Sequence, residues 1–244
     1  MTRYLINFSY DGSKYNGYQK QKGLDTIQQR LEDAAKYINN SKETKVSASG
    51  RTDAHVHAIN QYAHLDINVN ITEYKLKRAL NSLLPDDIYV RKTCIVDDNF
   101  HARYMVKEKE YIYKINTGDY NPIEKNYIFQ FNQNLDVEKM KKAIRFFVGT
   151  HDFTTFSSGD DSHKNKVRTI YDAFIESKDN YIIIHFKGSG FLKYMVRIMV
   201  GTLVDVGLNN IDENSIPDIL LKKDRKYAKR TIAPEGLYLY NVKY

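Results

Sequence analysis

The chain has 244 residues, of which 42% are hydrophobic and 27% charged, and its formal net charge is +7. These proportions are typical of a folded globular protein and exclude a disordered chain, while the length suits one large domain or two domains of roughly 100–140 residues. The single cysteine, Cys94, excludes an intramolecular disulfide and a cysteine-cluster metal site. No apolar run approaches the roughly 20 residues that a membrane span requires, so we expect a cytoplasmic protein without a membrane partner.

The net positive charge indicates a nucleic-acid partner only weakly. Basic proteins are attracted to RNA and DNA. The abundance of Lys, Asn, Ile and Tyr, with no Trp, is equally what an A/T-biased genome would produce. Charge alone therefore leaves both explanations open.

The first half of the chain predicts the element order β-α-β-β-α-β. Thr26, followed three residues later by Gln29, fits a capping box at the start of a helix. The buried side of the second helix should carry Leu76, Leu80, Leu83 and Leu84. In chain order the expected elements are a strand at 3–10, a helix after Thr26, a short strand at 45–48, a strand at 60–69, a helix between Thr72 and Pro85, and a strand at 88–96.

The second half of the chain predicts the same order again. Its expected elements are a strand at 110–116, a helix at 136–148, a hairpin of strands 170–177 and 181–186, a helix at 194–206 and a strand at 237–242. This order is typical of a ferredoxin-like unit. We therefore expect an α+β fold of two tandem ferredoxin-like units, residues 1–104 and 105–244. Their strands should join into a mostly antiparallel central sheet with helices on one side and a catalytic cleft between the units. The polar stretch 157–166 is either a lid or a surface loop.

The loop at residues 47–58, with the sequence SASGRTDAHVHA, concentrates groups that can do chemistry. Asp53 lies between two expected strands, where a sheet could present its carboxylate to a cleft. An Asp in a glycine-containing turn is more often structural, because it binds nearby backbone N–H groups. His55 and His57 could share one face of an extended segment, but no third ligand stands nearby, so we do not expect a zinc site.

Basic and aromatic residues stand together in segments 8–21 and 100–113. Basic groups bind phosphates and aromatic faces stack on unpaired bases, although for any single Tyr packing into the core is the stronger interpretation. We expect Tyr18, Gln19 and Arg103, from these segments, to bind substrate. Arg197 stands in an otherwise apolar helix, where a buried guanidinium requires a carboxylate partner.

Several of these segments together resemble the tRNA pseudouridine synthase A family. The box GRTDAHVHA at 50–58 carries most of the resemblance. The other matching segments, in family order along the chain, are 10–12 with 17–21, 81–88, 100–103, 109–113, 151–153, 191–201 and 233–239. Each motif alone is weak, but their common order along nearly the whole chain makes the resemblance specific.

The resemblance implies an enzyme that converts uridine to pseudouridine in structured RNA, classically in the anticodon stem-loop of tRNA. Members use one aspartate, need no metal and no cofactor, and act as homodimers with the RNA lying across both subunits. By match of motif, Asp53 resembles the nucleophile, Tyr111 the tyrosine that stacks on the target base and Arg197 the arginine that pairs with the nucleophile. Arg51 resembles the residue that helps displace the target nucleotide, and Leu237 the apolar floor under the base.

One residue departs from the family pattern. His55 stands where members usually have glycine, and if that position requires a positive φ, His adopts it less easily than Gly. The turn that presents Asp53 could be altered, or the imidazole could touch RNA. A paralogue that modifies another structured RNA, such as rRNA, therefore stays open.

Two further functional classes compete with the isomerase. A non-catalytic RNA-binding protein is compatible with ferredoxin-like units, but a pure binder has no need for a carboxylate beside a phosphate-rich ligand. A glycosidic-bond hydrolase usually shows a pair of carboxylates, and the sequence offers one well-placed candidate.

Overall fold

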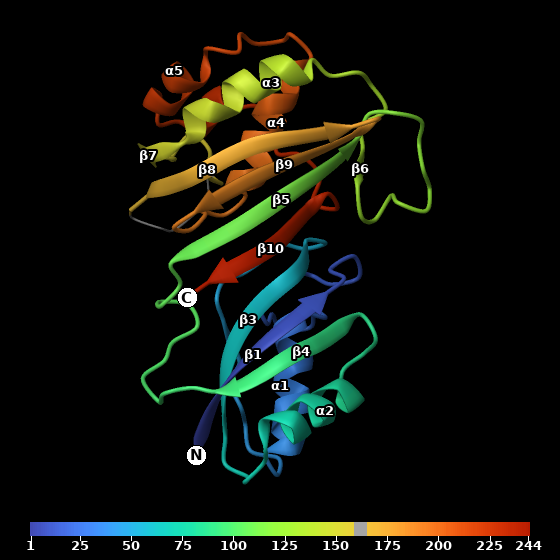
Figure 1. Cartoon of the computed structure of the whole chain (residues 1–244), viewed down its shortest axis with the longest axis vertical. Coiled ribbons are helices and arrows are strands. Elements are labelled where there is room, and N and C mark those ends of the chain that lie inside the picture. Colours follow the sequence, from blue (N-terminus) through green and yellow to red (C-terminus); the bar gives the residue numbers. More distant parts are fainter. Residues whose placement is uncertain (159–164) are drawn as a thin grey trace. The chain divides into compact units, whose positions relative to one another are not determined.

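The computed structural model describes residues 1–158 and 165–244. The stretch 157–166, expected to be either a lid or a surface loop, falls mostly on residues 159–164, which lie outside the described residues. The described chain divides into two compact units, residues 1–107 with 238–244, and residues 108–237. Each unit combines helices with a mostly antiparallel sheet (Figure 1), which confirms the α+β class and the tandem arrangement.

The first unit contains the predicted β-α-β-β-α-β series and one strand from the end of the chain. The elements are β1 (Thr2–Tyr10), α1 (Ile27–Ile38), β2 (Ser47–Ala48), β3 (His57–Ile67), α2 (Glu73–Leu83), β4 (Ile88–Ile95) and β10 (Leu237–Lys243). Strand β1 lies between β3 and β4 and is antiparallel to both, and the short β2 pairs with β3. Helices α1 and α2 contact each other beside this sheet, and α2 packs along β4 (Figure 1).

Local sequence signals explain where these elements begin and which side they bury. The Thr26 hydroxyl accepts a hydrogen bond from Gln29 N, as a capping residue does, and Thr72 caps α2 in the same way. One prediction is wrong: the Leu83 side chain is 41% exposed, while Leu84 is buried. Helix α2 ends at Leu83, and the extended backbone of Leu84 turns that next side chain into the core.

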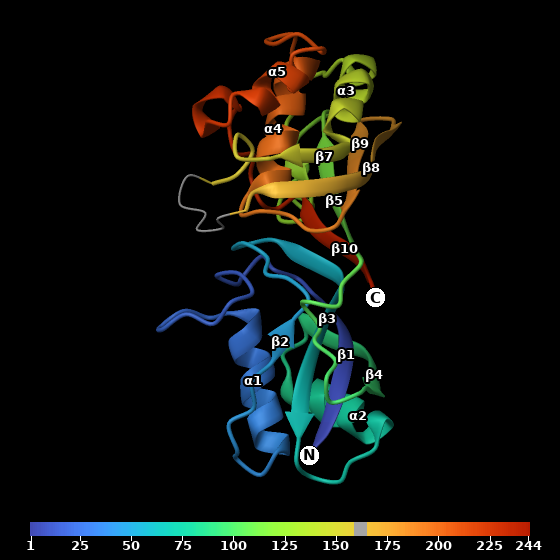
Figure 2. The same ribbon diagram turned by 90° about the vertical axis from the view of Figure 1, so that its left-hand side faces the viewer.

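The second unit is built around a sheet in the order β5-β9-β8-β7. Its elements are β5 (Glu108–Asn116), β6 (Phe129–Gln130), α3 (Val137–Ile144), β7 (Gly149–Asp152), β8 (Val167–Lys178), β9 (Tyr181–Gly188), α4 (Met195–Gly207) and α5 (Ile216–Leu221). The predicted hairpin is confirmed, and β8 and β9 turn at Asp179, which has a φ of 52°. Helices α3 and α4 lie side by side on one face of this sheet (Figure 2).

The structure adds detail that the sequence pattern did not indicate. The predicted helix at 136–148 ends as an α-helix at Ile144 and continues as a 3₁₀ turn, Arg145–Phe147. The elements β6, β7 and α5 were not expected, because each is too short to show a clear period. Residues 238–244, expected with the second unit, group with the first, since β10 runs parallel to the start of β3, with Tyr238 opposite His57.

Among the described helices, none has the length and apolar character to cross a membrane.

The loop after β4 is held by a cluster of charged and imidazole groups. The Arg3 guanidinium donates two hydrogen bonds of 2.8 Å to the Asp66 carboxylate and one of 3.1 Å to the Phe100 carbonyl. His64 Nδ1 accepts a hydrogen bond of 3.1 Å from Ala102 N, and the His64 ring lies 4.7 Å from that of His101. Burial, with the nearby His101 and Arg3, lowers the pKa of His64 to about 4. His64 is therefore a neutral acceptor that anchors this loop.

We expect the packing of α4 to forbid a side chain at Gly201. A Cβ atom there would lie 2.0 Å from the Arg230 carbonyl oxygen, which belongs to the backbone and cannot swing away. A helical Gly→Ala change normally stabilises by about 1 kcal/mol, but Gly201→Ala should destabilise by about 1–3 kcal/mol, measured by denaturant unfolding. Gly190→Ala is the matched control, because its Cβ would meet only the Arg168 side chain at ordinary distance. Equal stabilities of the two variants would contradict this account.

Because His64 is neutral in the folded protein, we expect the free energy of unfolding to fall in mild acid. Its pKa is lower in the folded protein than the ordinary 6.5, so the unfolded chain binds the proton more readily. This contribution to the free energy of unfolding is complete above the unfolded pKa and is lost as the pH falls from 6.5 toward about 4. His64→Asn keeps an acceptor in the place of Nδ1 and cannot titrate. The stability difference between about pH 7 and pH 5 should be smaller in His64→Asn than in the parent; equal differences would refute the assignment.

Candidate functional site

Asp53 lies in the loop that joins β2 to β3 and is half-buried, and it follows the exposed Arg51 and the buried Thr52. A hydrogen bond of 3.2 Å from Val56 N to the Asp53 carbonyl closes a four-residue turn that begins at Asp53. Upstream, the buried Gln61 side chain donates to the Gly50 carbonyl at 3.1 Å. The carboxylate is therefore carried on a loop that is tied down on both sides.

A second loop, residues 11–18, packs against this one backbone to backbone. Tyr18 N donates to the Thr52 carbonyl at 3.0 Å. A Cβ atom at Gly12 would lie 2.0 Å from the Val56 carbonyl oxygen, and Gly17, with a φ of 87°, would meet the Thr52 carbonyl at 2.9 Å. Glycine is required at both positions because no side chain fits between the two loops.

Buried polar groups lie beneath the two loops. The Tyr10 hydroxyl and Thr52 Oγ1 are 2.8 Å apart, and burial raises the pKa of Tyr10 to about 12, so this phenol stays neutral. His57 is 2% exposed, its Nδ1 accepts from Gly12 N at 3.1 Å, and its ring stacks on Tyr238 at 4.7 Å. Buried hydrogen bonds of this kind are costly to break, so they fix the loop from below.

The sequence-predicted binding residues of the first unit differ in accessibility. Gln19, Arg51 and Arg103 are exposed. Tyr18 is buried, with 2% of its surface exposed, and among the described residues its hydroxyl finds no hydrogen-bond partner. Tyr18 therefore offers its backbone to the Asp53 loop while its ring belongs to the core. Arg103 lies on the loop that His64 anchors, and its guanidinium stands 5.9 Å from the centre of the exposed Tyr104 ring.

In the second unit, Tyr111 and Arg197 both lie near the start of α4. Tyr111 is on β5, 7% exposed, and its ring meets Phe191 edge to face at 5.0 Å. Arg197 is half-buried on α4; its Nε donates to the Ile232 carbonyl at 2.8 Å, and its guanidinium lies 4.9 Å from the centre of the Tyr194 ring. These contacts orient both side chains within the unit. The carboxylate partner expected for Arg197 stays a prediction.

Leu237 is buried, with 4% of its surface exposed, and its N donates to the Pro234 carbonyl at 2.9 Å. The residue before it, Gly236, allows close packing, because a Cβ there would lie 2.5 Å from the Lys114 carbonyl oxygen. The backbone of this segment is thus fixed against β5. Sequence reasoning gave no anchoring role to Gln61, His64, Phe191 or Tyr194, although Phe191 and Tyr194 lie in the segment 191–201 that resembles the family.

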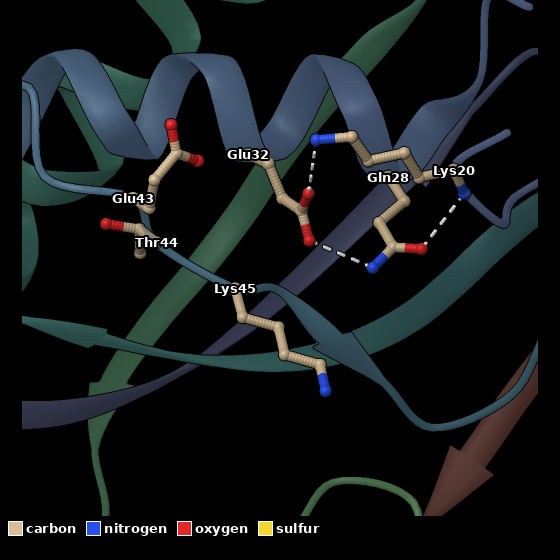
Figure 3. A pocket seen from close by; sticks show the side chains of 6 residues that line it. All are labelled: Lys20, Gln28, Glu32, Glu43, Thr44 and Lys45. Carbon is tan, nitrogen blue, oxygen red and sulfur yellow. Dashed lines mark hydrogen bonds and ion pairs between the residues drawn. The ribbon is translucent and has the colours of Figure 1, made fainter. Parts of the chain in front are cut away.

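A shallow pocket of about 340 Å³ lies beside α1, and none of its lining residues belongs to the expected site (Figure 3). Glu32 accepts hydrogen bonds from Gln28 at 2.9 Å and from Lys20 at 3.3 Å. The lining also includes Glu43, Thr44 and Lys45. With two lysines against two glutamates the pocket has no net charge, so it selects no ligand by sign. In the described part of the chain, no three His, Cys, Asp or Glu side chains gather closely enough to hold a metal ion.

Comparison with known proteins accounts for the sequence motifs that contain the candidate residues of the first and second units. The family model described as tRNA pseudouridine synthase matches residues 6–105 and 143–244. The chain is 42% identical over 247 residues to "tRNA pseudouridine synthase A 1" of Bacillus cereus, covering 100% of this chain and 99% of that protein. It is 44% identical to "tRNA pseudouridine synthase A" of Oceanobacillus iheyensis, covering 100% and 97%, and 43% identical to the Thermoanaerobacter protein of that name, covering 100% of both. The chain belongs to the tRNA pseudouridine synthase family.

Proposed function

We propose that this chain isomerises uridine to pseudouridine in the anticodon stem-loop of tRNA, with Asp53 as its catalytic carboxylate and with no metal or cofactor. The observation that carries the proposal is the loop at 49–56, whose backbone is held by hydrogen bonds on both sides of the half-buried Asp53. The full-length similarity to tRNA pseudouridine synthases supplies the reaction. We further propose that the enzyme works in the cytoplasm as a homodimer.

The reaction requires Asp53 to be ionised and held in a fixed direction. The N1–C1′ bond of the target uridine breaks, the uracil turns, C5 bonds to C1′, and the C5 proton is lost while N1 gains one. The product is an isomer of the substrate, so no oxidant and no energy source enters the balance. The carboxylate either attacks C1′ as a nucleophile or assists a glycal intermediate after loss of the C2′ proton. Both routes require an ionised carboxylate in a fixed direction, and a rigid loop lowers the entropic cost of reaching that geometry.

We assign Arg197 to pairing with the Asp53 carboxylate in the working enzyme. A guanidinium presents several N–H donors in a planar fork that fits the two oxygens of a carboxylate. Nε of Arg197 donates a hydrogen bond to the Ile232 carbonyl, and the Tyr194 ring lies against the flat face of the guanidinium. Such a side chain loses little freedom on binding an anion, so it is suited to keep Asp53 ionised in a site from which water is excluded.

Tyr111 and Leu237 supply apolar surface for the extruded base in this proposal. The Tyr111 ring is already oriented by its contact with Phe191, so stacking on uracil costs little additional side-chain entropy. A stem uridine is stacked and paired, and flipping it costs a few kcal/mol. We assign Arg51 to displacing the target nucleotide, and the exposed Gln19 and Arg103 to phosphate and sugar contacts that offset this cost. Tyr18 contributes through its backbone.

Mapping of pseudouridine in RNA, together with tRNA binding, separates this proposal from two alternatives. A paralogue acting on another structured RNA would form pseudouridine in that RNA and leave tRNA unmodified, and mapping pseudouridine in total RNA with and without the gene distinguishes the two. A non-catalytic RNA-binding protein would bind tRNA without changing it. The match of the whole chain to synthases of one name favours tRNA.

We expect Asp53→Asn to abolish pseudouridine formation while tRNA binding stays within about threefold of the parent. The asparagine keeps the shape of the loop and removes the charge and the nucleophile. Formation is followed by release of tritium from C5-labelled uridine in a tRNA transcript, and binding by filter retention. Asp33→Asn, on the exposed face of α1, is the matched control and should be fully active. An active Asp53→Asn would reject the proposal, and release of free uracil by the parent would indicate a hydrolase.

Arg197→Lys should lower kcat about 100-fold with little change in KM for tRNA, because an ammonium keeps the charge and loses the planar fork. Steady-state tritium release over a range of tRNA concentrations measures both constants. The control is Arg30→Lys, whose salt bridge to Asp25 is exposed on the surface and should leave kcat unchanged. Parental kcat in Arg197→Lys would exclude the assigned pairing.

A further inference from the structure

His55 occupies a backbone conformation that side chains disfavour. Its φ is 64°, in the left-handed region, and it lies two residues after Asp53. In that region the Cβ atom crowds the neighbouring carbonyl, so glycine is the usual occupant and Asn or Asp the next most common. The His55 side chain is exposed, so burial of apolar surface does not compensate for the strain.

The strained residue sits at a defined position of a turn. Val56 N donates to the Asp53 carbonyl at 3.2 Å, so residues 53–56 form a four-residue turn with His55 at its third position. A positive φ at the third position is the feature of type II turns, which favour Gly or Asn there. The conformation of His55 therefore determines whether the turn that begins at Asp53 closes.

Two hydrogen bonds from His55 reach the neighbouring loop. Its backbone N donates to the Tyr15 carbonyl at 3.2 Å. Its imidazole Nδ1 lies 2.7 Å from the Ser13 carbonyl oxygen. Because a carbonyl can only accept, Nδ1 carries the hydrogen, and it does so in both the neutral and the protonated ring. One residue in a strained conformation thus ties the Asp53 turn to the segment 13–15 twice.

We propose that His55 is a positioning residue, whose imidazole–Ser13 hydrogen bond holds the turn that aims the Asp53 carboxylate. This inference rests on the proposed function, in which Asp53 is the catalytic group. The side chain supplies through one hydrogen bond the restraint that glycine, with its greater freedom, would not provide. Local strain held by surrounding contacts is a recurrent feature of functional sites.

The proposal predicts an effect on kcat rather than on substrate binding. A looser turn leaves the RNA contacts of Arg51 and Gln19 in place but spreads the carboxylate over several directions. An imidazole that bound a phosphate directly would instead act on KM. The two roles therefore separate in steady-state kinetics.

Three substitutions distinguish the hydrogen bond from the strain. Asn Nδ2 is attached to Cγ, as His Nδ1 is, and Asn tolerates the left-handed region, so His55→Asn retains both features. His55→Gly relieves the strain and removes the bond. His55→Ala removes the bond and keeps a Cβ in the strained conformation. We expect kcat to fall about fivefold to tenfold in His55→Gly and His55→Ala, and to stay within about twofold of the parent in His55→Asn, with KM for tRNA unchanged.

The readouts are tritium release from a C5-labelled tRNA transcript and the thermal midpoint of each variant. His55→Gly keeps the test decisive if His55→Ala does not fold, because glycine adopts this φ without strain. Parental kcat in His55→Gly would overturn the proposal, as would a raised KM with unchanged kcat. Asp53→Asn is assayed beside them: if it is active, the proposed function fails, whereas an inactive Asp53→Asn with a parental His55→Gly rejects only the role of His55.

Discussion

The position of the turn that carries Asp53 depends on the contact of two loop backbones. Residues 11–18 and 49–56 approach so closely that Gly12 and Gly17 have no room for a side chain. Loops are usually the mobile part of a fold, but these two share hydrogen bonds at Tyr18 and His55 and rest on buried polar groups. The backbone of the Asp53 loop is therefore restrained by the neighbouring loop as well as by its own turn.

In the second unit, too, contacts with neighbouring groups orient the candidate side chains. Tyr111 is oriented by Phe191, and Arg197 by a backbone carbonyl and the Tyr194 ring. Tyr194, the residue immediately before α4, has a φ of 61°, as His55 has a φ of 64° after Asp53. Non-glycine residues in the left-handed region thus stand beside the candidate residues of each unit. Conformations of this kind persist only where surrounding contacts hold them.

Polar groups under the first unit's loops are kept neutral by burial. Tyr10 remains a phenol and His64 a neutral acceptor, because the interior penalises their charged forms. The hydrogen bond from Ala102 N to His64 therefore keeps one direction over the physiological pH range, and the hydrogen bond between Tyr10 and Thr52 joins two neutral hydroxyls. In the proposed function, the exposed Arg51 and Arg103 supply positive charge for contacts with the RNA backbone.

The sequence by itself determined the element order, the helix starts at Thr26 and Thr72, and the loop that carries Asp53, because caps, hydrophobic periods and motifs are local properties of the chain. Only the tertiary structure decided that Tyr18 turns inward, that the last strand runs beside the start of β3, and that His55 adopts a positive φ. Each of these depends on which distant segment lies opposite. The anchor His64 acts on Ala102, which lies 38 residues away, so no local pattern of the sequence indicates this hydrogen bond.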